Sequence, residues 1–149
     1  MKLELEIKTK EIKDNRLRAV LEILFTASYI NNKHIKYLRP FNLSPPQYNI
    51  LRILRGSYPN HLHIQSIKKR MLEKMPHTTR MIDKLFENGY IERERREDDR
   101  RKIYIIITKK GLEVMSHIDQ IHPEFMQFTH NLSDKEANEL ANLLEKLRD

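Results

Sequence analysis

The chain of 149 residues contains no cysteine and only three glycines. Without cysteine it can form no disulfide bond, no cysteine-ligated zinc site and no thiol sensor, and this composition suits a reducing compartment. With so few glycines it has little material for the glycine-rich loops that cradle phosphates in nucleotide-dependent enzymes. We also find no nucleophile elbow and no acid–base pair in a suitable context, and we therefore expect the protein not to be an enzyme.

Long hydrophobic runs are also missing. No stretch approaches the roughly 18 apolar residues that a bilayer-spanning helix needs, and residues 1–14 are rich in acids and lack the apolar segment of a signal peptide. We therefore expect no membrane partner and a cytoplasmic location. Seven histidines are present, but none of their spacings matches a zinc site. We accordingly expect neither a metal nor another cofactor.

Positive charge is in excess, with 28 Lys and Arg against 21 Asp and Glu and a net charge of +7. A basic surplus favours polyanionic partners, because binding releases counterions from phosphates. It would equally suit a ribosomal protein or an anionic membrane surface, so charge alone does not decide the function. The apolar residues fall in periodic runs, which argues against disorder. The length fits a single domain over residues 1–149.

A helical period of 3.6 residues recurs along most of the chain. Ser44 and Gln47 form a capping box around Pro45, which is typical of a helix start, and Gly89 fits a left-handed C-cap. Six helices are expected. Four of them lie at about residues 14–38, 45–56, 64–72 and 76–89. The fifth starts at Thr108, with a kink or interruption at Pro123, and the sixth starts at a second capping box at Ser133. The last of these should bury Leu140, Leu143, Leu144 and Leu147. Residues 1–10 alternate apolar and charged side chains, which fits a short strand or an ordered arm.

After Gly89 the apolar period changes from 3.6 to 2. Residues 90–95 and 102–107 are therefore expected to form two strands joined by a charged turn. Two helices with a tight turn between them match a helix-turn-helix, and the hairpin that follows is typical of a wing. We therefore expect a mainly α fold with a small β wing, namely a winged helix-turn-helix over residues 40–110. Helical regions at residues 11–39 and 111–149 would form a dimerisation region.

One face of the expected helix at residues 76–88 has the composition of a DNA-reading surface. His77, Arg80 and Lys84 lie opposite the apolar face formed by Ile82, Leu85 and Phe86. Arginine can form two hydrogen bonds with guanine, and histidine or threonine can contact bases or phosphates. A solvated surface helix would explain such a face equally well if it stood alone. The order of helix-turn-helix, glycine and charged hairpin favours DNA contact.

The expected hairpin turn carries charges of both signs. Five acids lie within residues 92–99, whereas Arg100, Arg101 and Lys102 follow the turn. Asp99 could orient the Arg101 guanidinium by a charge-assisted hydrogen bond for insertion into a narrow minor groove. A hairpin of mixed charge that serves only solubility is the alternative.

These motifs together resemble the MarR (multiple antibiotic resistance regulator) family of bacterial transcription factors, over about residues 14–148. Ser44-Pro45-Pro46-Gln47-Tyr48 resembles the start of that family's second helix. The most specific segments are Thr79-Arg80-Met81-Ile82-Asp83-Lys84-Leu85, Gly89-Tyr90-Ile91-Glu92-Arg93, Asp99-Arg100-Arg101 and Ile107-Thr108-Lys109-Lys110-Gly111. The resemblance implies a homodimer whose recognition helices enter major grooves and whose wings enter minor grooves. It also implies a set of groove-facing residues: His77, Thr78, Thr79, Arg80 and Lys84, with Arg101 and its orienting acid Asp99 in the wing.

The resemblance further implies a transcriptional regulator, usually a repressor, that binds a pseudo-palindromic site on double-stranded DNA. Many members release DNA when a small anionic or phenolic ligand binds. A ligand pocket is expected between the long first helix, the second helix and the helix after Thr108, with these candidate lining residues: Tyr29, His34, Tyr37, Arg39 and Tyr48. Each of them could instead be a core or interface residue. The alternative function is a winged-helix module for protein or RNA contact without operator specificity.

Overall fold

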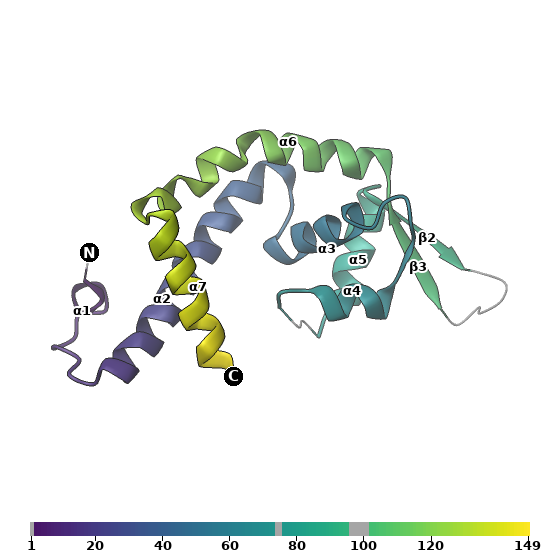
Figure 1. Ribbon diagram of the computed structural model, residues 1–149. Coiled ribbons are helices and arrows are strands. Elements are labelled where there is room, and N and C mark those ends of the chain that lie inside the picture. Colours follow the sequence, from purple (N-terminus) through teal and green to yellow (C-terminus); the bar gives the residue numbers. More distant parts are fainter. Residues whose placement is uncertain (1, 74–75, 96–101) are drawn as a thin grey trace. The chain divides into compact units, whose positions relative to one another are not determined.

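The computed structural model describes residues 2–73, 76–95 and 102–149 (Figure 1). It is mainly helical with a small antiparallel sheet, as expected. The six expected helices are α2 (Asn15–Leu38), α3 (Pro45–Arg55), α4 (Ile64–Arg70), α5 (Thr78–Glu87), α6 (Lys109–Met126) and α7 (Asp134–Arg148). Of the two alternatives for residues 1–10, the strand is wrong, because Leu3–Glu6 form a short helix, α1, in which Leu3 is buried. Short 3-10 helices follow α2 (Arg39–Phe41) and α6 (Gln127–Asn131).

The helices begin at the caps that the sequence indicates. Asp14 accepts hydrogen bonds from the backbone N–H groups of Arg16 and Leu17 at the start of α2. The capping boxes of α3 and α7 are both complete. In the second box, the side-chain hydrogen bond from Ser133 and, to a smaller extent, its backbone hydrogen bond hold the pKa of Glu136 below its usual value. These interactions satisfy N–H groups that have no partner inside the helix.

Helix α5 ends as expected at Gly89, which has a φ of +73°. The N–H of Tyr90 donates to the carbonyl of Leu85 at 3.0 Å, and the N–H of Gly89 donates to the carbonyl of Phe86 at 2.9 Å. This pair of bonds is the Schellman motif, in which glycine adopts the left-handed conformation without a steric penalty. The chain therefore turns directly from α5 into the sheet.

The sheet has three strands in the order β1-β3-β2. The expected hairpin is confirmed as β2 (Ile91–Arg95) and β3 (Ile103–Ile107), with Ile91 opposite Ile107. Strand β1 (Leu62–His63) pairs with the other edge of β3 and was not expected. Two residues are too few to show an alternating pattern.

The described residues divide into two compact units, residues 1–115 and 116–149. In the first unit, α3 contacts α2, α4, α5 and β3, and Figure 1 shows α3, α4 and α5 beside the hairpin. Its core consists mainly of aliphatic side chains from these elements, including Ile50, Leu51, Leu54, Ile67, Ile82, Leu85 and Ile105. This core supports α5 from its inner side.

The last helix differs from expectation. Helix α7 has no buried residue, and Leu140, Leu143 and Leu147 are 46%, 59% and 61% exposed. The apolar spacing of this helix was read correctly, but among the described residues of its own unit these leucines stay exposed. The expected interruption at Pro123 is also absent, since α6 continues through it to Met126. No helix among the described residues is both long and apolar enough to cross a membrane.

Candidate nucleic-acid interface

Helix α5 has a buried inner face and an exposed outer face. Ile82 and Leu85 are buried, and so is Thr78, whose hydroxyl lies 3.8 Å from the sulfur of Met71. Thr78 was expected to face a DNA groove, and this part of the prediction is wrong because only 1% of the residue is exposed. Phe86 was expected on the inner face but is 48% exposed.

The structure brings three of the predicted groove residues to one hollow. His77, Arg80 and Lys84 line a depression of about 290 Å³, and Ser44 and Gln47 from the start of α3 line its other side. The three α5 residues are exposed, as is Thr79. Among the described residues no acidic side chain lines this hollow, and the start of α3 contributes to its wall. The local field of the hollow therefore favours an anion.

The start of α5 has no side-chain cap from its N-cap residue. His77 is the N-cap residue, and its side chain makes no capping hydrogen bond. No acidic residue lies in the first turn. Because the first N–H groups of a helix need partners outside it, this end of α5 can accept an anionic oxygen.

The predicted wing residues Asp99, Arg100 and Arg101 lie outside the described residues. The described part of the hairpin is a five-residue ladder in which Arg95 stands opposite Ile103.

A contact that the sequence reasoning missed joins the wing to α5. The Arg93 guanidinium on β2 forms an ion pair with the Asp83 carboxylate on α5, and its Cζ lies 4.9 Å from the centre of the Phe86 ring. Arg93 shares its strand face with the buried Ile91, and a cation on such a face needs a partner. The alternation of residues along β2 could therefore have predicted that Arg93 needs a partner, although it does not identify Asp83.

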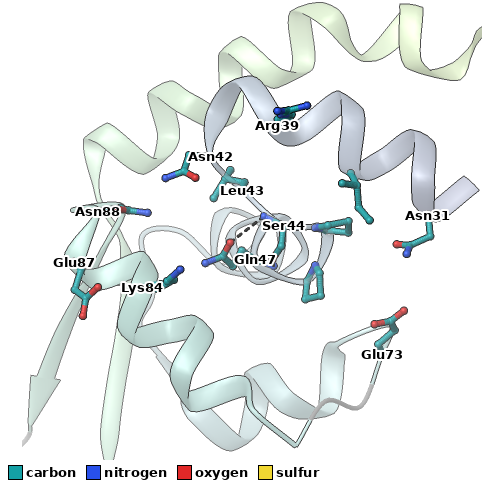
Figure 2. A pocket seen from close by; sticks show the side chains of 13 residues that line it. Asn31, Arg39, Asn42, Leu43, Ser44, Gln47, Glu73, Lys84, Glu87 and Asn88 are labelled. Atoms are coloured by element: carbon teal, nitrogen blue, oxygen red, sulfur yellow. Dashed lines mark hydrogen bonds between the residues drawn. The ribbon is translucent and has the colours of Figure 1, made fainter.

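Two pockets lie beside α3, and Figure 2 shows the larger one. It measures about 640 Å³ and is bounded by residues of α2, α3 and α5, among them Arg39 and Lys84. A second pocket of about 300 Å³ is lined by His34 and Tyr48. Tyr29 and Tyr37 line neither pocket, and no residue of α6 does. Helix α5 lines the larger pocket, and the expected site beside the helix after Thr108 stays a prediction.

The histidines near the sheet have structural partners. Nε2 of His61 lies 3.2 Å from a carboxylate oxygen of Glu94, and Nδ1 of His63 accepts the N–H of Gln65 at the start of α4. Among the described residues, no group of three His, Cys, Asp or Glu side chains is placed to hold a metal ion.

Known proteins resemble this chain in sequence and in fold. The profile of the MarR family matches residues 43–103. The HTH-type transcriptional regulator SarZ of Staphylococcus saprophyticus is 31% identical over 140 residues, which cover 93% of this chain and 92% of the relative. The structure of AbsC, a MarR family transcriptional regulator from Streptomyces coelicolor, has a TM-score of 0.81 at 22% identity and covers 94% of this chain and 96% of AbsC.

A further solved structure is a mutant MarR from E. coli complexed with operator DNA. Its TM-score is 0.76 at 24% identity, and the match covers 99% of both chains. At this level of identity the likeness concerns the fold.

Proposed function

The chain belongs to the MarR family of transcriptional regulators, and we propose that it binds a pseudo-palindromic operator on double-stranded DNA as a homodimer. The observation that carries this proposal is the hollow in which Arg80, Lys84 and His77 lie together opposite the start of α3. A helix that exposes long cationic donors on one face and is held by a core on the other fits the major groove.

The residues divide into base-reading and phosphate-binding roles. Arg80 projects from the middle of the exposed face, and its guanidinium can pair with a guanine edge. Thr79, His77 and Lys84 flank it on the same helix and would contact phosphates or neighbouring bases. The start of α5, where the His77 side chain makes no capping hydrogen bond, would lie near a backbone phosphate. We assign Arg100 and Arg101, oriented by Asp99, to the adjacent minor groove.

The dimer would be formed by residues 11–39 and 111–149. Leu17, Val20 and Leu24 are 51%, 45% and 62% exposed along one side of α2, and α7 carries the leucine stripe described above. Monomeric proteins seldom expose apolar stripes of this kind, whereas a second copy would bury them. Two copies of α5 related by a twofold axis would then read half-sites about 10 bp apart.

The proposal predicts how binding responds to salt and to sequence. If each dimer neutralises about six to ten phosphates, affinity should fall roughly 10³- to 10⁵-fold between ~50 and ~200 mM salt. The measurement is a titration of the purified protein with a duplex selected from a random-sequence pool, with unselected duplex and RNA as controls. Equal binding to all three would contradict operator recognition and would support the alternative, a winged-helix module for RNA or protein contact.

The outcome of operator binding would be repression. A dimer bound across a promoter blocks access of the polymerase, and such a regulator would work in the cytoplasm of a bacterium, where the chromosome lies. Footprinting on the DNA upstream of its own gene would show whether that promoter is a target.

Ligand control is a second proposal, and the larger pocket supports it. Lys84 lines both this pocket and the hollow on the DNA-binding face, and Figure 2 shows its side chain pointing toward the space beside Gln47. Arg39 adds a second cation to the pocket, whose lining also includes the carboxylates of Glu73 and Glu87. An anion held there would compete with DNA for Lys84, and an aromatic carboxylate combines that charge with an apolar body that the lining can cover.

We expect benzoate at millimolar concentration to weaken binding of the selected duplex, and Arg39→Met to reduce that effect several-fold. The measurement is the duplex affinity with and without benzoate. Lys36→Met removes the same charge from α2 at an exposed position outside the pocket and serves as the matched control. An unchanged duplex affinity in benzoate, or equal responses of the two variants, would exclude this pocket as an aromatic-anion site.

A further inference from the structure

Side chains at the beginning of α6 form hydrogen bonds with the end of α5, and these side chains are not among the residues proposed to contact DNA. The Thr108 hydroxyl donates to the carbonyl of Gly89 at 2.7 Å, and the Lys110 ammonium donates to the carbonyl of Asn88 at 2.8 Å. The backbone N–H of Thr108 donates to the carbonyl of Tyr90 at 3.0 Å. Three consecutive carbonyls beyond the last turn of α5 therefore receive their hydrogen bonds from the start of α6. Without these donors they would depend on water.

The same residues build the first turn of α6. The Thr108 hydroxyl accepts the N–H of Gly111 at 3.0 Å, so one oxygen both caps α6 and binds the end of α5. The two segments approach so closely that a Cβ added at Gly111 would lie 2.3 Å from the carbonyl oxygen of Tyr90. The Lys110 ammonium also lies 5.3 Å from the centre of the Tyr90 ring. All of these residues belong to the same compact unit.

We propose that Thr108 and Lys110 are positioning residues for DNA recognition, because they join the carbonyl end of the recognition helix to the first turn of α6. This inference rests on the proposed function. Helix α6 continues from this turn into the region proposed to form the dimer. In the dimer, the two junctions set the direction and spacing of the two α5 helices, and so determine which spacing of half-sites the protein accepts.

The test compares two duplexes: the one that the wild-type protein selects from a random-sequence pool, and the same duplex with one base pair inserted at its centre. Thr108→Val keeps the shape of the side chain but removes both hydroxyl hydrogen bonds, and Lys110→Met removes the donor to Asn88. Lys110→Met, which loses one hydrogen bond, should reduce the discrimination against the inserted base pair by about 3- to 10-fold, and Thr108→Val, which loses two, should reduce it by at least as much. Thr108→Ser should restore it.

Matched controls distinguish a positioning role from an effect on stability and from an effect of the lost charge. Ser133→Ala removes the equivalent hydroxyl cap from α7 and should lower thermal stability without changing the ratio of the two affinities. Lys109→Met removes the same charge as Lys110→Met at an exposed neighbouring position and should weaken both duplexes equally. If Thr108→Val and Lys110→Met discriminate as the wild type does, the junction has no positioning role. If the wild type selects no duplex, the proposed function itself fails.

Discussion

Replacing Arg80 by alanine is expected to weaken binding of the selected operator by about 1–3 kcal/mol, or roughly 5- to 150-fold. Arg80 is exposed at the centre of the α5 face and lines the hollow beside the start of α3. A guanidinium there can form two hydrogen bonds with one guanine, and no neighbouring side chain could replace that geometry. Affinity for random duplex should change far less, because only one charge is lost. Fluorescence anisotropy titrations of the two duplexes measure both effects.

Two further variants make the Arg80 result specific. Arg80→Lys keeps the charge but cannot form the paired hydrogen bonds, so it should lose most of the operator preference while keeping the affinity for random duplex. Lys109→Ala removes the same charge from an exposed position outside α5 and should leave the preference intact. If Arg80→Ala bound the operator as tightly as the wild type, the assignment of this helix face to base reading would be wrong.

The largest loss of operator affinity is expected from breaking the proposed dimer. Leu143 and Leu147 are 59% and 61% exposed on α7, so glutamate at both positions should leave the folded chain intact while placing charges in the dimer contact. A monomer can engage only one half-site, and the loss of the second lowers operator affinity by about 10²- to 10⁴-fold. Sedimentation gives the oligomeric state, and an anisotropy titration gives the affinity.

The matched control for this variant lies on the same helix. Asn138 and Asn142 are exposed on the side of α7 opposite the leucine stripe, so glutamate at these two positions adds the same charge without entering the contact. This control should remain dimeric and should bind the operator with only the modest loss that two added negative charges cause. Circular dichroism should show equal helix content in both variants. A Leu143→Glu/Leu147→Glu protein that stays dimeric would place the dimer contact elsewhere.

Much of the fold could be predicted because its signals are local. The Ser44 and Ser133 caps bind N–H groups three residues away, and the end of α5 depends on the left-handed conformation that Gly89 adopts easily. Periodicity likewise reports on neighbouring turns. Strand β1 and helix α1 escaped prediction because they span two and four residues, which is less than one clear repeat of either period.

The candidate site could be predicted only in part. The exposed face with Arg80 and Lys84 follows from helical spacing, but Thr78 lies at the edge of that face, and its burial depends on the position of Met71. The ion pair of Arg93 with Asp83 joins a strand to a helix. Its partners stand ten residues apart with a turn between them, so no single period relates them. The larger pocket, which residues of α2, α3 and α5 line, depends in the same way on how separate helices pack.

The sequence by itself determined that this chain is a winged helix-turn-helix protein with a basic, outward-facing recognition helix. Helix caps, the left-handed glycine and the change of period from 3.6 to 2 all act over a few residues, and neighbouring side chains suffice to specify them. Only the tertiary structure decided that Ser44 and Gln47 face Arg80 and Lys84, and that Thr108 and Lys110 hold the end of the recognition helix. These contacts depend on the packing of elements far apart in the chain, which the shared core establishes.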